Sequence, residues 1–162
     1  MRFTSDEALP GTVDEVLAAF VDLAFLAELQ ELSTISAPEV LSQERDGDIV
    51  RQRLRYRFTG SLSSAVTRVI DREKLVWVDE HVYDLGAHQA TFRIIPEHYA
   101  NRFDATGTER FEPIDTGSRW VVDADLQVRW PLVGRLVEGA IVSGLRETLA
   151  GEAVLLGRWL SR

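Results

Sequence analysis

The sequence predicts an α+β fold: a curved, seven-stranded antiparallel sheet, two short helices between strands 1 and 2, and a long C-terminal helix across the concave face. Three observations predict it. Polar and apolar residues alternate with period two through most of residues 38–127, as they do in strands with one solvated face. Two short helical patterns follow a first strand, 2–9, and one long helical pattern, 132–160, follows all the strands.

Length and composition favour one globular domain spanning residues 1–162. Hydrophobic residues make up 45% of the chain and charged residues 27%, which is typical of a folded domain. The lack of cysteine excludes a disulfide framework and thiol chemistry. The formal net charge of −8 argues against a nucleic-acid partner, because phosphate binding needs a basic surface.

The N-terminal residues are polar and acidic, unlike a signal peptide. The longest apolar-rich stretch, which begins at Leu132, is interrupted by charged residues such as Arg135 and Glu138, so we expect no membrane span. We therefore expect a cytoplasmic protein.

The two short helices have recognisable start signals. Thr12 and Glu15 have the spacing of a capping box, which predicts a helix from there to about Val21. Asp22 is a suitable N-cap for a second helix that runs to about Glu31.

Turn residues divide the alternating region into six strands. Asp46-Gly47-Asp48 predicts a tight hairpin, since Asp-Gly tolerates the positive φ that such turns require. Residues 61–70 break the alternation and predict an irregular segment or a helical turn. The predicted strands are 40–45, 51–58, 74–84, 88–96, 101–112 and 118–129.

Arginines occupy alternate positions from Arg51 to Arg57. This run would suit an acidic partner, but the acidic net charge favours an ordinary solvated sheet face. The last predicted strand is also amphipathic. The apolar side chains on one of its faces are Trp120, Val122, Ala124, Leu126 and Val128.

The long helix is predicted to span about 45 Å, at about 1.5 Å per residue, which is enough to cross the sheet. A row of smaller residues, Ala140, Gly144 and Thr148, lies beside its apolar row, so glycines here are predicted to allow a close approach or leave space beneath the helix. The apolar row has i+4 spacing and consists of Val133, Val137, Ile141, Leu145, Leu149 and Ala153.

This order of elements resembles the START-like (SRPBCC, helix-grip) superfamily over nearly the whole chain. The sharpest local likeness is Val-Arg-Trp-Pro-Leu-Val-Gly at 128–134, followed by Glu138. It is similar to the entry to the final helix in an actinobacterial group of START-like proteins of unassigned function. The opening residues 2–4 and the pair 159–160 are similar to that group too.

The resemblance implies a cavity between the sheet and the long helix, in which superfamily members bind lipids, sterols, polyketides or hormones. We therefore predict binding or transport of a small hydrophobic ligand that is a lipid, polyketide-like or isoprenoid. The alternatives are a polyketide cyclase/dehydratase-like enzyme and a protein-interaction module with a vestigial cavity. The residues predicted to line the cavity, or else to fill a solid core, are Tyr56, Phe58, Phe92, Ile94, Trp120, Val122, Leu126, Val137, Ile141, Leu145 and Leu149.

A polar group on the predicted strand 74–84 consists of Asp79, His81 and Tyr83, on the same face as Trp77. If this face points inward, His81 is suited to orient a ligand hydroxyl or act as a general base. The opposite face is more apolar and is therefore the predicted interior; it carries Val76, Val78 and Val82.

Glu109 shares its parity with Phe103 and Phe111. It is therefore either a carboxylate inside the concavity, which would need a partner or a raised pKa, or a solvated residue where the strand bends. His81 and Glu109 are the acid–base pair that an enzyme would use. Two titratable groups converging in the cavity would favour an enzyme, whereas a carrier needs only an apolar lining.

No metal site is predicted, because there are three histidines, no cysteine, and no ligand-like spacing of His88 and His98. The sequence has no phosphate-binding loop, dinucleotide fingerprint or nucleophile elbow, so we expect no cofactor. It leaves the ligand's identity and the oligomeric state open.

Overall fold

The computed structural model describes residues 1–162 and contains seven strands and four α-helices. The strands are β1 (Arg2–Leu9), β2 (Glu39–Asp46), β3 (Ile49–Arg57), β4 (Val76–Asp84), β5 (Gln89–Pro96), β6 (Phe103–Ile114) and β7 (Gly117–Val128). The helices are α1 (Val13–Phe20), α2 (Leu23–Ala27), α3 (Ser64–Thr67) and α4 (Gly134–Leu160), with short 3-10 turns η1 (Glu28–Glu31) and η2 (Arg72–Lys74).

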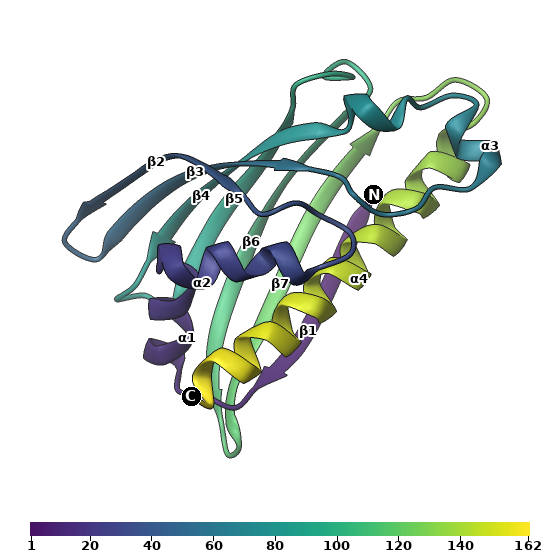
Figure 1. Ribbon diagram of the computed structural model, residues 1–162. Coiled ribbons are helices and arrows are strands. Elements are labelled where there is room, and N and C mark those ends of the chain that lie inside the picture. The colour runs from purple at the N-terminus through teal and green to yellow at the C-terminus, as the bar shows by residue number, and fades with distance from the viewer.

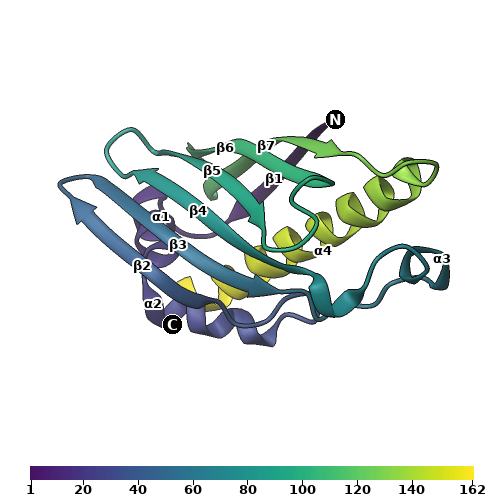
Figure 2. The same cartoon turned by 90° about the horizontal axis from the view of Figure 1, so that it is seen from above.

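The strands form one antiparallel sheet in the order β1-β7-β6-β5-β4-β3-β2. Strands β2 to β7 follow one another as a meander, and β1 pairs with β7, with Phe3 opposite Ala124. The sheet is curved, and α4 runs along its concave side (Figure 1). Seen from above, α4 extends from the end near α3 to the end near α1 and α2 (Figure 2). This is the predicted architecture.

The predicted N-caps hold α1 and α2 in place at one end of the sheet. Thr12 Oγ1 accepts a hydrogen bond from the Glu15 backbone N–H at 3.2 Å, and Asp22 accepts from the Ala24 N–H at 2.8 Å. The buried Gln52 side chain donates to the carbonyl of Phe20 at 3.1 Å. That bond ties the end of α1 to the inner face of β3, so the helix closes this end of the concavity.

Helix α4 begins two residues later than predicted, at Gly134. Leu132 has a φ of 66° and its side chain is fully exposed. A left-handed residue cannot belong to a right-handed helix, so residues 131–133 form a turn instead.

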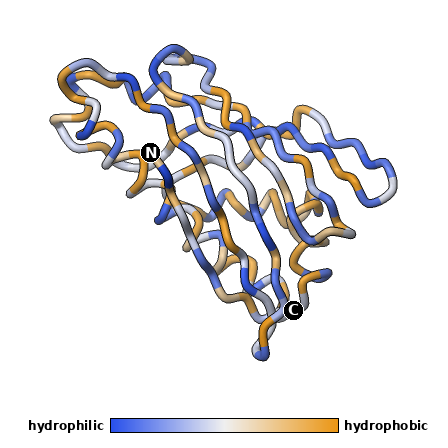
Figure 3. The backbone as a smooth tube through the Cα atoms, turned by 180° about the vertical axis from the view of Figure 1, so that it is seen from behind, coloured by the Kyte–Doolittle hydropathy of each residue, from blue (hydrophilic) through white to orange (hydrophobic).

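The sheet faces follow the alternation of the sequence, which is visible along the strands in Figure 3. The arginines of β3 lie on the outer face, where Arg53 pairs with Glu80 at 2.9 Å and Arg55 with Glu97 at 2.7 Å. The acidic partners of these arginines are therefore glutamates of the same chain. The prediction of a solvated arginine face is confirmed.

The predicted interior face of β4 is wrong. Trp77, Asp79, His81 and Tyr83 point into the concavity, and Val78 points to the outer face. Val78 is nonetheless only 8% exposed, because it sits opposite Arg55 and Ile95 in register. Long arginine side chains cover apolar neighbours with their methylene groups, so the more apolar face of this strand is not the inner one.

Candidate functional site

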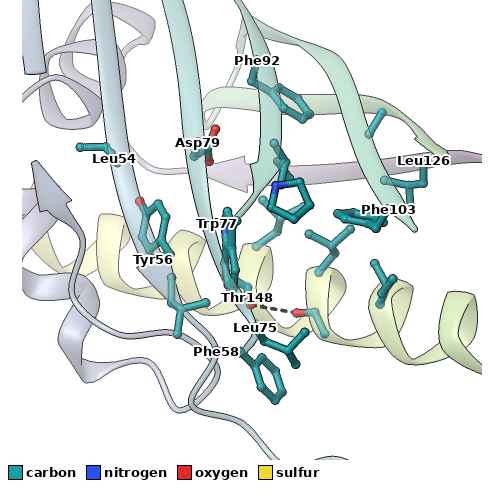
Figure 4. Close-up of a pocket in the computed structure, with 18 of the residues that line it drawn as sticks. Leu54, Tyr56, Phe58, Leu75, Trp77, Asp79, Phe92, Phe103, Leu126 and Thr148 are labelled. Carbon is teal, nitrogen blue, oxygen red and sulfur yellow. Dashed lines mark hydrogen bonds between the residues drawn. The ribbon is translucent and has the colours of Figure 1, made fainter. Parts of the chain in front are cut away.

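A cavity of about 260 Å³ lies between the concave face of the sheet and α4. Thirty of its 40 lining residues are hydrophobic, a composition suited to an apolar ligand with a few polar anchors. All eleven residues predicted to line the cavity do so, from Tyr56 on β3 to Leu149 on α4. In Figure 4 the rings of Tyr56, Trp77 and Phe103 project from the sheet into the space in front of α4.

The cavity exists because α4 presents small residues where the sheet curves away. A Cβ atom built on Gly144 would meet no atom within 4 Å, although Gly144 lines the cavity. The larger neighbours Ile141, Leu145 and Leu149 are only partly buried. An apolar row with unfilled space beside it is what a hollow interior requires, since a packed core would cover these side chains.

Threonine side chains hold the middle of α4 against the segment that follows η1. Thr148 Oγ1 donates to the carbonyl of Gly144 at 2.8 Å, so the buried Thr34 hydroxyl is the donor in the 2.7 Å bond between Thr34 and Thr148. The first of these bonds, from Thr148 to Gly144 within α4, is the dashed line in Figure 4. The bond from Thr34 ties the helix to the segment that follows η1.

Asp79, His81, Glu109 and Trp120 form a connected polar cluster on the sheet wall of the cavity. His81 Nε2 lies 2.8 Å from Glu109 Oε1, and Trp120 Nε1 donates to Glu109 Oε2 at 3.0 Å. His81 Nδ1 lies 2.9 Å from Asp79 Oδ1. Both ring nitrogens of His81 and both carboxylate oxygens of Glu109 therefore have partners inside the protein.

These carboxylates set the charge of His81. Burial alone would lower the pKa of the imidazole, but the charges of Asp79 and Glu109, together with their hydrogen bonds, raise it well above its ordinary value. His81 is therefore an imidazolium at neutral pH. Its ring stacks on Tyr83 and Phe92 at centroid distances of 5.2 and 5.5 Å, which also favours the cation.

Gly107 on β6 makes this stacking possible. It faces Phe92 across the sheet, and a Cβ atom there would lie 2.4 Å from Phe92 Cζ. Because glycine has no side chain, the Phe92 ring can occupy this space. The Phe92 ring in turn stacks on His81.

Glu152 on α4 is a further cavity-lining group, which the sequence reasoning missed. Burial, and then the charges of Glu109 and Asp79, raise its pKa to about 8, against a smaller lowering by His81. Glu152 is thus an uncharged carboxylic acid at neutral pH. It continues the row of Ala140, Gly144 and Thr148 by one more i+4 step, a signal that would have placed it in the cavity.

Some polar atoms of the site have no hydrogen-bond partner in the protein. The Asp79 Oδ1 atom is buried and forms the ion pair with His81 Nδ1 at 2.9 Å. Asp79 Oδ2 has no hydrogen-bond partner in the protein, and the Asp79 side chain lines the cavity with 18% of its surface exposed. Burial, with the nearby carboxylates, raises the pKa of Tyr56 and of Tyr83, so both phenols stay protonated donors. Asp79 Oδ2 and the Glu152 carboxyl group are therefore free to meet a ligand, whereas both nitrogens of His81 and both oxygens of Glu109 already have partners.

No group of three or more histidine, cysteine, aspartate and glutamate side chains is arranged to hold a metal ion. No helix is both long enough and apolar enough to cross a membrane.

Solved structures with the same architecture define the class. The fold is the helix-grip fold. A Thermus thermophilus protein, TTHA0849, superposes with a TM-score of 0.67 at 20% identity, covering 96% of this chain and 97% of that one. The Zhui aromatase/cyclase from a Streptomyces species gives 0.66 at 16% identity, with 98% and 92% covered. Norcoclaurine synthase from Thalictrum flavum gives 0.68 at 14%, with 100% and 87% covered.

Within this class, the chain belongs to the family described as "Protein of unknown function (DUF2505)", whose model matches residues 4–160. A search of curated proteins found no match to the sequence.

Proposed function

We propose that this protein binds a small hydrophobic molecule in the cavity between the sheet and α4. The observation that supports this most directly is the cavity itself, about 260 Å³ and mostly apolar. Burial of apolar ligand surface there is worth about 25 cal/mol per Å². A protein-interaction module with a vestigial cavity fits less well, because it requires a filled interior.

The cavity has a polar end and an open end, which suits an amphipathic ligand. The polar cluster lies beneath α1, where the Phe20 ring packs on Trp120 at a centroid distance of 4.9 Å. At the other end, the solvent-exposed residues Lys74 and His98 also line the cavity and mark its mouth. A ligand that enters through this mouth would place the group that goes in first against the polar cluster. Lipids, polyketide-like molecules and isoprenoids all have suitable shapes.

Acid–base catalysis of the cyclase or dehydratase kind is the second candidate. The observation that favours it is the presence in the cavity of two acidic side chains with oxygens that have no hydrogen-bond partner, Glu152 and, through its Oδ2 atom, Asp79. A neutral carboxylic acid is a proton donor and a carboxylate is an acceptor, which together make an acid–base pair. In this role Glu152 and Asp79 replace the predicted pair His81 and Glu109, which hold each other.

The two candidates differ in what the protein does to its ligand. Small molecules extracted from wild-type protein and from a Glu152→Gln variant, both purified from the same host, are compared by mass spectrometry. If the protein is a carrier, both proteins yield the same molecule. If it is an enzyme, the variant retains the unreacted substrate, and this molecule differs in mass or structure from the molecule bound to wild type.

The binding proposal is tested with a pair of α4 variants. Gly144 lines the cavity and Gly139 is exposed on the same helix, and both have open space where a Cβ would be. Leucine at either position improves helix propensity, but only Gly144→Leu places a side chain in the cavity. We expect N-phenyl-1-naphthylamine to fluoresce strongly with wild type and Gly139→Leu, and at least tenfold more weakly with Gly144→Leu. Equal fluorescence from both variants would place the probe elsewhere and contradict the proposal.

A further inference from the structure

We propose that the ligand carries a protonated amine on an apolar body, and that Asp79 and Glu152 bind the ammonium group at the closed end of the cavity. This inference rests on the proposed function, because it specifies the chemistry of the molecule that the cavity binds.

The charges at the closed end of the cavity do not balance. The closed end contains the carboxylates of Asp79 and Glu109 and one compensating cation, His81. Glu152, on the helix opposite them, is a third acidic group. No arginine lines the cavity, and Lys74 and His98 are exposed at its mouth. Buried charge of one sign is costly unless a counter-ion is present. The closed end therefore lacks a cation.

The hydrogen-bonding capacity of the closed end also suits an ammonium group. Glu109 is saturated by His81 and Trp120. Asp79 Oδ1 is paired with His81 Nδ1 at 2.9 Å, whereas Asp79 Oδ2 accepts no hydrogen bond from the protein and belongs to a side chain that lines the cavity. An ammonium group has three donors and no acceptor, so it matches a free carboxylate oxygen and a second carboxyl across the cavity. A ligand carboxylate would instead meet two acidic groups.

Aromatic rings line the cavity around these acids. Tyr56 and Trp77 stack at 5.9 Å, and both rings line the cavity beside Asp79. Tyr83 faces the same end. Aromatic faces attract cations, most strongly where water is excluded. The same rings bury the apolar part of the ligand.

Binding of a cation is linked to a proton on Glu152. Without ligand, Glu152 is protonated at neutral pH. An ammonium group beside it favours the ionised carboxylate, so the pKa of Glu152 falls and the proton is released to solvent. The groups that share this field are Asp79, His81 and Tyr83 on β4, Glu109 on β6 and Tyr56 on β3.

The test uses three ligands of nearly equal shape: phenylbutylamine, phenylbutanol and phenylbutyrate. Isothermal titration calorimetry at pH 7 in two buffers of different ionisation enthalpy gives both the affinity and the number of protons released. We expect the amine to bind wild type at least tenfold more tightly than the alcohol, with release of about one proton. The butyrate should bind most weakly.

The matched variants are Glu152→Gln and Glu147→Gln. Glu147 is exposed on the same helix and does not line the cavity. Proton release should disappear in Glu152→Gln and persist in Glu147→Gln. Circular dichroism confirms that each variant is folded.

The outcomes separate the two proposals. If amine and alcohol bind equally well, the ammonium site is wrong and the apolar cavity stands. If the amine binds tightly but releases the same proton in Glu152→Gln, then Glu152 is not its partner. If none of the three ligands binds and the naphthylamine probe also fails, the proposed function itself is wrong.

Discussion

At the scale of single residues, the polar side chains of the site are of two kinds: some bind each other, and others have oxygen atoms that face the cavity. His81 has Asp79 and Glu109 on its two nitrogens and aromatic rings on both faces. Glu109 has no free oxygen. We therefore interpret His81 and Glu109 as positioning residues, and Asp79 and Glu152 as the groups in contact with a ligand. Substitutions should distinguish these roles.

Glu152 should make the folded protein less stable as the pH rises. In the unfolded chain its carboxyl ionises near 4.5, whereas in the folded protein it keeps its proton to about pH 8. Between these values the unfolded chain binds fewer protons, so the free energy of unfolding falls with rising pH. We expect Glu152→Gln to be more stable than wild type at pH 8 by about 1–3 kcal/mol, a moderated value because the side chain faces a cavity.

Urea denaturation of wild type and Glu152→Gln at several pH values measures this difference. It should be close to zero near pH 4 and grow toward pH 8. His81 is present in both proteins, so its own titration cancels in the comparison. A difference that stays constant with pH would mean that Glu152 titrates normally.

Trp120→Phe should test the indole donor of the cluster. The substitution keeps an aromatic ring but removes the N–H that donates to Glu109 Oε2. A buried carboxylate oxygen left without a partner costs about 1–3 kcal/mol. The control is Trp77→Phe, whose indole makes no hydrogen bond to the protein, and chemical denaturation compares the two. Equal losses of stability would show that the cluster gains nothing from this donor.

At the scale of secondary structure, the sequence predicted most elements well and some faces badly. Turn residues and capping residues are local signals, so strand limits and the N-caps Thr12 and Asp22 agree with the structure. The prediction for the inner face of β4 is wrong, because the more hydrophobic face of this strand is the outer one. In this strand the cavity wall is polar, and arginine side chains cover the outer valines. No pattern within β1 or β7 shows that they pair with each other.

Gly107→Ala should test whether the glycine on β6 is what allows the Phe92 ring to stack on His81. The added methyl group would lie 2.4 Å from Phe92 Cζ and from the Asp123 carbonyl oxygen. We expect a loss of about 1–3 kcal/mol in stability from this overpacking, and movement of the Phe92 ring away from His81. NMR chemical shifts of the His81 ring protons report the ring movement. Gly139→Ala is the control, since an exposed helical glycine gains up to about 1 kcal/mol on replacement. Unchanged His81 shifts in Gly107→Ala would contradict this account.

At the scale of the whole molecule, the cavity is closed at one end of the sheet and open at the other. Side chains from α1 and α2 form the main core at the closed end, and a smaller cluster that includes Val66, Ile70 and Val137 lies beside the mouth. The cavity between them depends on where α4 lies. The i+4 row and the small residues of α4 were visible in the sequence. Whether they enclose space depends on the curvature of the sheet, which no local pattern records, so Glu152 and the free oxygen of Asp79 were not recognised. The likeness to an actinobacterial group stays a prediction.

Native mass spectrometry of the protein purified from its own host tests the central claim most directly. We expect a small-molecule adduct on the intact chain that is lost on denaturation. The adduct should persist in Gly139→Leu and be absent from Gly144→Leu. If both variants retain the adduct equally, the space beneath α4 is not the binding site. If wild type carries no adduct and binds no apolar probe added in excess, the cavity binds nothing.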